Sequence, residues 1–258
     1  MPGWYPSALR YNLTALMFIP FSTEQELERA VQLYVKAFSG DPYLKAILGG
    51  NWSLLPIHGR SVFRAALLEG FVYAVKAQDL EDSNREKIVS IGLFFEPGTS
   101  IFATEAQRSL GYRDWFDRLA PEAQEWHTTV VSLQIDMRSL ADIIRSLALQ
   151  APQHRKDVVE PLFTDKEKSE RWWCSGLMTD PEYQRKGYAK AIIRMALDKA
   201  ADNGGFVGLA TVPEINVIKY KAMGFGIRAT YNMPTLSGEL YIYSLKISKE
   251  EFESDTTK

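Results

Sequence analysis

The sequence predicts an α+β fold in which a sheet of about six to seven strands is flanked by helices. Short apolar runs bounded by turn residues recur along the chain, which is typical of buried strands. Between them, apolar residues repeat at three- and four-residue spacing, which indicates amphipathic helices. The expected strands are 13–20, 71–77, 88–95, 172–179, 206–211, 225–231 and 239–247.

The composition is that of an ordinary globular protein. The 258 residues are 46% hydrophobic and 24% charged, enough for one large domain. A formal net charge of -2 gives no general electrostatic reason to expect nucleic acid or an anionic membrane as a partner. No apolar run approaches the ~20 residues that span a bilayer, and the N-terminus has no secretory pattern. We therefore expect neither a nucleic-acid nor a membrane partner.

A single cysteine, Cys174, excludes an internal disulfide and fits a reducing compartment. We expect a cytoplasmic protein, with the nucleus as the alternative location. Cys174 could be a nucleophile, but a buried strand cysteine is more often a small hydrophobic residue. No histidine lies near it in the sequence to activate it.

The first helix should begin at Thr23, because Glu26 follows three residues later as a capping box requires. It should stop at Gly40-Asp41-Pro42. A second helical region is expected from about Tyr43, with a break at Gly49-Gly50 and a resumption near His58. The next two strands then form an antiparallel hairpin with a charged turn.

A helical insertion is predicted at about 99–171, before the strand that starts at Trp172. Helical patterns occupy 104–119 and 122–149, with Pro121 as a breaker between them. The polar stretch 153–171 is expected to be a mobile loop. Aromatic residues in this region point more to core packing than to an acceptor pocket; they are Trp115, Phe116 and Trp126.

The stretch 172–201 organises the chain, because a buried strand and an amphipathic helix are joined by a basic connection. A helix N-terminus has unpaired N–H groups and a partial positive charge, so it can bind phosphate. Gly187 and Ala189 let a bulky group approach the backbone. Positive charge comes from Arg185, Lys186 and Lys190. The alternative is an ordinary basic first turn with no ligand.

The remaining pattern completes the fold. Asn203-Gly204-Gly205 should end the central helix, and Pro213 suits the first turn of a further helix that runs to about Met223. A loop is expected at 232–238 between the last two strands. The residues 248–258 read as a polar, disordered C-terminal tail.

This order, with two motifs, resembles the GNAT superfamily of acyl-CoA-dependent N-acyltransferases. Gln184, Gly187 and Ala189 match its pyrophosphate loop, and Tyr220 to Phe225 (Tyr-Lys-Ala-Met-Gly-Phe) matches its Tyr-x-x-x-Gly-Phe element. The resemblance implies a mixed, mostly antiparallel sheet in a single domain spanning 1–247. Segments 92–98, 111–116 and 119–126 are also similar to a fungal group that carries a helical insertion before the cofactor strand.

The resemblance implies acetyl-CoA as co-substrate and direct attack of an amine on the thioester. Backbone groups of Leu177, Met178 and Thr179 would pair with the pantetheine arm. Tyr220 would protonate the departing thiolate, and an N–H on the Leu177 strand would stabilise the oxyanion. The other implied cofactor contacts are Gln184, Arg185, Lys186, Gly187, Tyr188, Ala189, Lys190 and Asn216.

The general base is left open. Some members of the superfamily use a glutamate near the start of the cofactor strand, where this chain has Trp172-Trp173. The substitutes are a water chain or one of four side chains, each more typical of a surface group than of a base: Glu96, Asp136, His127 and Glu170.

Three functions are compatible with these residues. The first is an N-acetyltransferase for a small amine, which the insertion favours by narrowing the acceptor side. The second is a protein acetyltransferase acting on lysine or an N-terminus, and the third is an acyl-CoA-binding protein that has lost catalysis. No metal-binding motif is present in the sequence, so no metal is expected. The chain should act as a monomer or homodimer.

Overall fold

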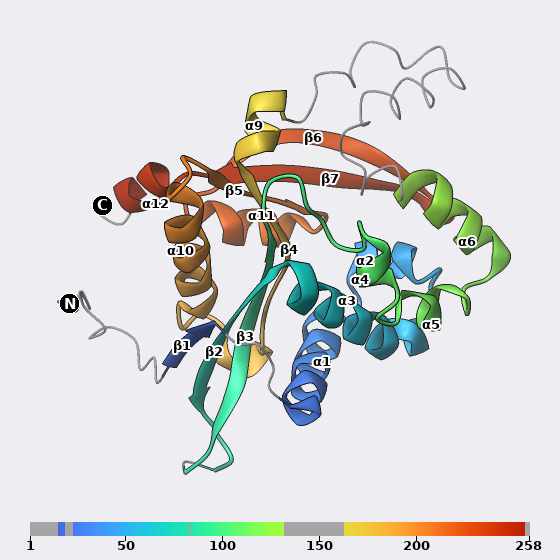
Figure 1. The fold of residues 1–258 in the computed structure, drawn as a ribbon, viewed down its shortest axis with the longest axis horizontal. Coiled ribbons are helices and arrows are strands. Elements are labelled where there is room, and N and C mark those ends of the chain that lie inside the picture. The colour runs from blue at the N-terminus through green and yellow to red at the C-terminus, as the bar shows by residue number, and fades with distance from the viewer. Residues whose placement is uncertain (1–14, 19–22, 83, 132–162, 256–258) are drawn as a thin grey trace.

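A computed structural model describes residues 15–18, 23–82, 84–131 and 163–255 of the chain (Figure 1). Seven strands form one sheet in the order β1-β2-β3-β4-β5-β7-β6, which confirms the predicted fold class. The strands are β1 (Ala15–Phe18), β2 (Phe71–Gln78), β3 (Glu86–Phe95), β4 (Arg171–Thr179), β5 (Phe206–Thr211), β6 (Gly226–Thr235) and β7 (Gly238–Ile247).

All neighbouring strands are antiparallel except β4 and β5, which are parallel. The last hairpin is longer than expected, because β6 and β7 pair as far as Thr235 and Gly238. The Thr235 hydroxyl donates to the Gly238 carbonyl and accepts from the Ser237 N–H, at 2.7 and 3.3 Å. These bonds close a two-residue turn, so most of the loop predicted at 232–238 is strand.

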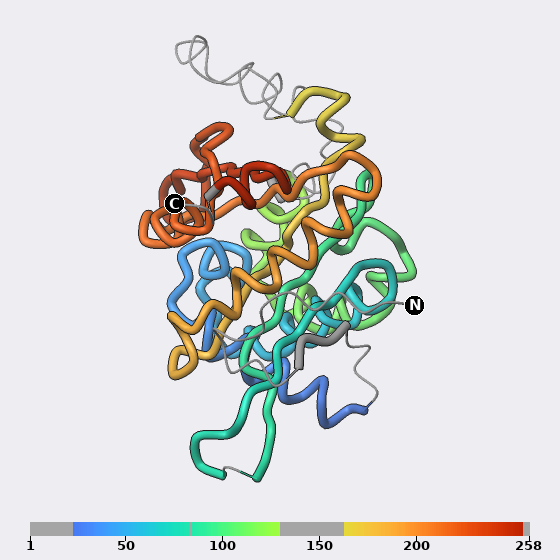
Figure 2. Tube along the Cα trace, turned by 90° about the vertical axis from the view of Figure 1, so that its left-hand side faces the viewer, coloured from blue at the N-terminus to red at the C-terminus, as the bar shows by residue number. Residues whose placement is uncertain are grey.

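The helices lie in two layers on either side of the sheet (Figures 1 and 2). Helices α1 and α3 pack against one face and α10 against the other, and each layer has its own hydrophobic core. The main helices are α1 (Glu24–Phe38), α2 (Pro42–Ile47), α3 (Leu55–Glu69), α10 (Tyr188–Ala201), α11 (Glu214–Lys221) and α12 (Lys249–Asp255).

Glycine lets α10 approach the sheet closely. A Cβ added to Gly92 on β3 would stand 2.5 Å from Cγ2 of Ile192 on α10. Real Cβ atoms do not come this close to another heavy atom, so a larger residue would push the helix away. The buried Ile192 thus fixes the height of α10 over β3, and with it the position of the helix N-terminus.

The caps of the first helices follow the sequence closely. Thr23 accepts a hydrogen bond from the Glu26 N–H, at 3.2 Å, and α1 begins at the next residue as predicted. The second helical region resumes earlier than predicted. A 3₁₀ turn at Trp52–Leu54, capped by the Asn51 side chain, runs directly into α3 at Leu55.

Short helices replace the two long helices predicted after β3. Gly111, with a left-handed φ of 115°, separates α4 (Glu105–Arg108) from α5 (Tyr112–Phe116). Pro121 separates helical stretches as predicted, and it is also the first residue of α6 (Pro121–Trp126), because the first helical position needs no N–H donor. A π-helical turn follows at His127–Val131. The rest of the predicted helix, 132–149, lies outside the described residues.

The polar stretch predicted as a mobile loop ends in a helix, α9 (Asp165–Glu170). Its capping box pairs Thr164 with Glu167 in both directions. Glu167 also binds Lys246 of β7 and Arg228 of β6, at 2.9 and 3.3 Å. These contacts fix the start of β4 against the far hairpin, and 153–162 lies outside the described residues.

The predicted C-terminal tail is also partly wrong, because 249–255 forms helix α12. Ser248 and Glu251 cap each other, and Phe252 is buried in the α10-side core. The Lys190 ammonium of α10 stands 5.2 Å from the Phe252 ring centre. Phe252, an apolar residue among polar ones, thus packs α12 against α10. Pro213, expected in the first turn of α11, is its N-cap.

Candidate active site

The sheet opens between β4 and β5. The two strands pair only from Arg171 to Trp173, whereas β4 pairs with β3 as far as Thr179. A β-bulge at Ser175 adds one residue to β4 opposite Leu93 and Phe94, and bulges bend a strand. Beyond Trp173, β4 therefore has a free edge among the described strands.

The alternation along β4 decides which main-chain groups reach that edge. The Asp180 N–H donates to Val89 of β3, at 2.8 Å, so the groups of Met178 also point toward β3. Leu177 and Thr179 consequently direct their N–H and C=O groups to the free edge. Of the three residues predicted to pair with a pantetheine arm, these two have the required orientation and Met178 does not.

The Gln184–Lys190 connection has the features of an anion-binding surface. Arg185 and Gly187 both have left-handed backbones, with φ of 60° and 80°, and Gly187 is the N-cap of α10. Such conformations turn successive N–H groups toward one side. Within the described residues, the N–H groups of 185–190 have no hydrogen-bond acceptor. The predicted pyrophosphate loop therefore presents unpaired donors at a helix N-terminus.

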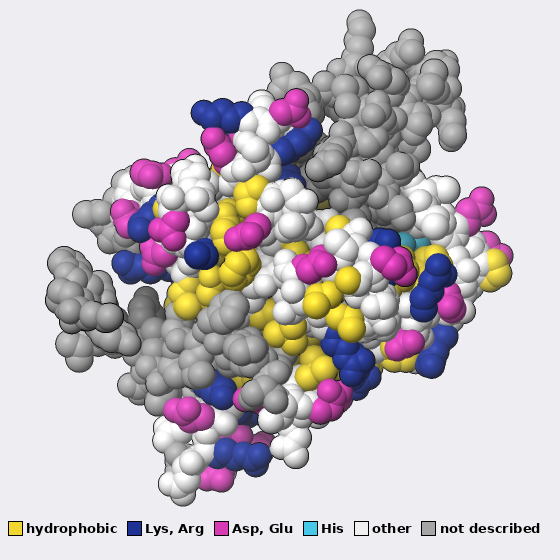
Figure 3. Space-filling view, viewed as in Figure 1, with side chains coloured by type: hydrophobic (Ala, Val, Ile, Leu, Met, Phe, Trp, Pro, Cys, Tyr) yellow, Lys and Arg dark blue, Asp and Glu magenta, His cyan; other side chains and the backbone are white. Residues whose placement is uncertain are grey.

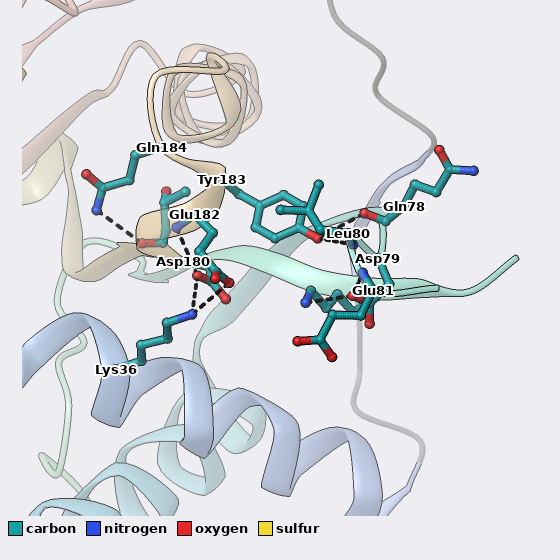
Figure 4. Close-up of polar contacts among 11 residues, drawn as sticks. Lys36, Gln78, Asp79, Leu80, Glu81, Asp180, Glu182, Tyr183 and Gln184 are labelled. Atoms are coloured by element: carbon teal, nitrogen blue, oxygen red, sulfur yellow. Dashed lines mark hydrogen bonds and ion pairs between the residues drawn. The ribbon is translucent and has the colours of Figure 1, made fainter. Parts of the chain in front are cut away.

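A network of polar contacts holds this loop in place (Figure 4). The Lys36 ammonium of α1 binds Asp180 and Glu182, at 2.8 and 3.0 Å. The buried Tyr183 hydroxyl donates to the Gln78 carbonyl and accepts from the Leu80 N–H, at 3.0 and 2.9 Å. The loop is thus tied to α1 on one side and to the end of β2 on the other.

The side chains of the loop are arranged around these anchors. Gln184 donates to the Thr179 carbonyl at 3.4 Å, which places it at the free edge of β4. Lys186 stands 4.8 Å from the Tyr183 ring centre, and Arg185 is exposed. Tyr188 is buried, and Ala189 and Lys190 are partly exposed in the first turn of α10. Basic side chains and unpaired N–H groups therefore lie together at the N-terminus of α10.

Tyr220 lies near the other end of the open edge. Its ring packs on Phe225 with centres 5.5 Å apart, against the core on the α10 side. Burial raises the pKa of Tyr220 well above its usual value, and the thiol of Cys174 and the carboxyl of Asp41 raise it further. The phenol is therefore protonated at neutral pH and can act only as a proton donor in its resting state.

The other predicted contact, Asn216, faces the end of β5. Its amide donates to the Thr211 hydroxyl at 3.3 Å, in the first turn of α11. A buried hydroxyl also stands at the bulge, where Ser175 Oγ has no hydrogen-bond partner among the described atoms. Sequence reasoning did not select Ser175, and only the bulge identifies it.

The side chains suggested as a base are dispersed. Glu96 is exposed after β3, and Glu170 lies at the end of α9, before β4. His127 is buried among aromatic rings, and burial lowers its pKa to about 4. Asp136 lies outside the described residues. None of the three described side chains is next to Tyr220.

Cys174 and the aromatic residues of the predicted insertion are buried in the hydrophobic cores. Burial raises the pKa of Cys174 to about 12, so the thiol is not ionised at neutral pH. Trp115, Phe116 and Trp126 are buried in the core on the α1 side, as the sequence favoured. In the part of the chain that the structure covers, no cluster of potential metal ligands occurs. The described helices are also too short or too polar to cross a membrane.

Asp41 is a residue that sequence reasoning used only as a helix stop. It caps α2, accepting from the Leu44 N–H at 3.0 Å. Burial raises its pKa, and the N–H groups of Leu44 and Tyr43 oppose that rise. After burial and the Cys174 thiol, the Asp41 carboxyl is a further cause that raises the pKa of Tyr220. Its Gly-Asp-Pro context gives no signal beyond that of a turn.

A known structure shares this arrangement of elements. Arylalkylamine N-acetyltransferase 2 from Aedes aegypti is 14% identical, with a TM-score of 0.50 over 91% of this chain and 98% of that one. A structure described as histone acetyltransferase HPA2 and related acetyltransferase, from Corynebacterium glutamicum, is 15% identical. Its TM-score is 0.46, covering 88% of this chain and 93% of that one. The first of these likenesses supports the fold alone.

The sequence itself matches a family. Residues 106–225 fit the profile of the acetyltransferase (GNAT) family. The matched range includes β4, the 184–190 loop and α11, which carries Tyr220. The comparison with curated proteins finds no relative by sequence. The matched residues contain the open edge of β4 and the loop of unpaired N–H groups described above. Over residues 106–225, just under half of its length, the chain matches the acetyltransferase (GNAT) family, and this match supports an N-acetyltransferase that uses acetyl-CoA.

Proposed function

We propose that this enzyme transfers an acetyl group from acetyl-CoA directly to the primary amine of a small molecule. One observation carries the proposal: the free edge of β4 runs between the open N–H groups of 185–190 and the phenol of Tyr220. An extended thioester needs edge groups along its arm, donors at its phosphates and an acid at its sulfur. The orphaned Ser175 hydroxyl at the bulge is a further polar group available to a ligand.

Different residues would bind different parts of acetyl-CoA. The N–H groups of 185–190 and the side chains of Arg185 and Lys186 would bind the pyrophosphate. Leu177 and Thr179 would pair with the amide groups of the pantetheine arm. Asn216, in the first turn of α11, would contact the same ligand from the β5 side.

The chemistry would take place near the bulge. The acceptor nitrogen attacks the thioester carbonyl carbon, and the Leu177 N–H would stabilise the resulting oxyanion. As the C–S bond breaks, Tyr220 would donate its proton to the leaving sulfur. A thiol and a phenol have ordinary pKa values of about 8.5 and 10, and burial raises the pKa of Tyr220 further. The transfer therefore requires that the departing thiolate is itself poorly solvated, which raises the pKa of the thiol in the same way. The proton lost from the attacking nitrogen would restore the phenol.

The contact between α6 and the end of the β6–β7 hairpin favours a compact acceptor. The Trp126 indole of α6 donates to the Pro234 carbonyl of β6, at 2.8 Å. This bond links the short helices after β3 to the end of the long β6–β7 hairpin (Figure 1). Acidic and basic side chains are also interspersed over the described part of the face seen in Figure 3, which shows no continuous acidic track for a basic protein tail.

The test combines binding with turnover. A thermal-shift titration with acetyl-CoA should show a saturable rise in melting temperature, beside CoA and ATP as controls. CoA release should then be measured with 2-phenylethylamine, spermidine and lysine, and with lysine-containing peptides. Turnover with a small amine supports the proposal. Turnover with peptides alone would identify a protein acetyltransferase, and binding without any turnover would identify an impaired acyl-CoA-binding protein.

A further inference from the structure

The backbone of the 184–190 loop has an uncommon conformation. Arg185 has a φ of 60°, in the left-handed region that residues other than glycine seldom adopt. Such a conformation persists only where the surrounding contacts fix it. Among the described residues, the N–H groups of 185–190 have no acceptor, so hydrogen bonds from these groups do not fix it. The loop is therefore held by contacts to neighbouring parts of the molecule.

Tyr183, in the turn just before the loop, makes the deepest of these contacts. The residue is 1% exposed, and its hydroxyl donates to the Gln78 carbonyl at 3.0 Å and accepts from the Leu80 N–H at 2.9 Å. Figure 4 shows the side chain pointing from the turn to the end of β2. Displacing this hydroxyl would leave a main-chain donor and a main-chain acceptor unpaired, which is costly.

The end of β2 is itself a firm support for Tyr183. The Asp79 N–H donates to the Arg85 carbonyl at 2.7 Å, which closes the β2–β3 hairpin. The Lys87 ammonium binds the Asp79 carboxylate at 2.9 Å, and the two side chains are only 12% and 14% exposed. The same ammonium lies 5.2 Å from the centre of the Tyr183 ring. The hairpin end thus contacts both the ring and the hydroxyl of Tyr183.

The Tyr183 ring also contacts the loop directly. The Lys186 ammonium lies 4.8 Å from the ring centre, and the face of an aromatic ring attracts a cation. Lys186 is exposed, and it forms no ion pair with another described residue. Its charge is therefore held in the same segment as the unpaired N–H groups, with no described carboxylate to neutralise it.

We propose that Tyr183 is a positioning residue for the pyrophosphate of acetyl-CoA. Its hydroxyl fixes the loop backbone with the N–H groups open, and its ring holds the Lys186 ammonium beside them. Tyr183 acts through these groups and not on the thioester. Its loss should therefore weaken binding of the phosphate-bearing part of the donor and leave the chemical step unchanged. The inference rests on the proposed function, in which acetyl-CoA is the donor.

The test separates the hydroxyl from the ring. Tyr183→Phe removes the hydroxyl alone, and Tyr183→Leu removes the ring as well. Tyr34→Phe is the matched control, because it removes another buried phenol hydroxyl, which bonds to His58 Nδ1 at 3.0 Å in the core on the α1 side. Melting temperatures are recorded for all four proteins.

Two fragments of the donor locate the effect. Adenosine 3′-phosphate 5′-diphosphate has the pyrophosphate without the thioester arm, and S-acetylpantetheine has the thioester arm without the pyrophosphate. Isothermal titration gives the dissociation constants of acetyl-CoA and of the diphosphate. Turnover of a small amine is measured with acetyl-CoA and with S-acetylpantetheine as donors.

Tyr183→Phe should raise both dissociation constants by about tenfold, because the main-chain groups at the end of β2 lose their partner and the loop is released. Tyr183→Leu should raise them by about 30-fold, because Lys186 loses its ring contact as well. In both variants kcat at saturating acetyl-CoA and kcat/KM with S-acetylpantetheine should stay within about twofold of wild type, since only binding of the phosphates is lost. Tyr34→Phe should melt at a lower temperature and bind both ligands as wild type does.

A folded Tyr183→Phe protein that binds both ligands as tightly as wild type would overturn the role of Tyr183. An equal loss with S-acetylpantetheine would also overturn it, because the effect would then not lie at the phosphates. Should Tyr183→Leu not fold, Tyr183→Phe decides alone, since it removes a single oxygen atom.

The failure of the proposed function would look different. A wild-type protein that binds acetyl-CoA but acetylates no amine would overturn the proposed function, and the two dissociation constants would still test Tyr183. A wild-type protein that binds neither acetyl-CoA nor the diphosphate would overturn both.

Discussion

The Lys36 ammonium of α1 lies 2.8 Å from Asp180, the residue that follows β4, and 3.0 Å from Glu182 in the next turn (Figure 4). Hydrogen bonds to both carboxylates raise the pKa of Lys36. The contact links the helix that leads to Asp41 with the loop that presents open N–H groups. One ion-pair cluster therefore joins α1 to the segment that leads into the 184–190 loop.

Lys36→Met should weaken acetyl-CoA binding moderately without changing the turnover rate at saturation. The Lys36 side chain is 45% exposed, so solvent screens the ion pairs and their loss should cost no more than about 1 kcal/mol. That corresponds to a rise in the dissociation constant of up to about fivefold. Isothermal titration at low and high salt measures it, with Lys166→Met as a control at an exposed helix pair. A large loss of turnover at saturating acetyl-CoA would contradict a purely positional role.

Gly187→Glu should abolish acetyl-CoA binding, because it places a side chain and a negative charge at the anion-binding turn. The left-handed backbone at Gly187 also adds strain of about 1 kcal/mol for any other residue. Gly204→Glu is the matched control, since Gly204 also has a positive φ, with open space around it, at the far end of α10. The control should be destabilised similarly and still show the acetyl-CoA thermal shift. Equal loss of the shift in both variants would mean that strain alone is responsible.

Tyr220→Phe should lower the turnover rate by about 10- to 100-fold and leave the acetyl-CoA dissociation constant within about twofold of wild type. The change removes one hydroxyl and keeps the ring against Phe225. Steady-state kinetics and titration measure the two quantities. Tyr241→Phe, which removes an exposed hydroxyl bonded to Thr230, is the control. An unchanged turnover rate would exclude Tyr220 as the acid.

Stability should fall as the pH is lowered from about 6.5 toward 4. Burial lowers the pKa of His58 to about 3 and that of His127 to about 4, against an ordinary value near 6.5. Over this window the unfolded chain binds protons that the folded chain does not, so unfolding is favoured as pH falls. Each histidine contributes on the order of 1 kcal/mol per pH unit.

Urea denaturation at pH 7, 6, 5 and 4 measures this dependence. The double variant His58→Gln, His127→Gln should be less stable at pH 7 but should have a flatter profile between pH 6.5 and 4. Glu167 affects stability in a separate, lower pH range. Its pKa is about 2 in the folded state and about 4.3 in the unfolded state, so its contribution is lost only as the pH falls below about 4.3. A profile just as steep in the double variant would assign the acid sensitivity to other groups.

Local sequence was sufficient wherever neighbouring residues decide the outcome. Caps such as Thr23 and stops such as Gly204-Gly205 depend on hydrogen bonds within a few residues, and the structure has them where the pattern predicted. Some local signals were overridden. Phe252 docks α12 on α10, and the 232–238 segment extends β6 because β7 is there to pair with it.

The sequence by itself determined the strand, loop and helix from β4 to α10, including Gln184, Gly187 and Tyr220, because their chemistry is encoded in contiguous residues. Only the tertiary structure decided that β4 parts from β5 after Trp173, and that Leu177 and Thr179, not Met178, face the gap. These relationships depend on how distant segments pair and pack, and the spacing of residues along one chain does not record them.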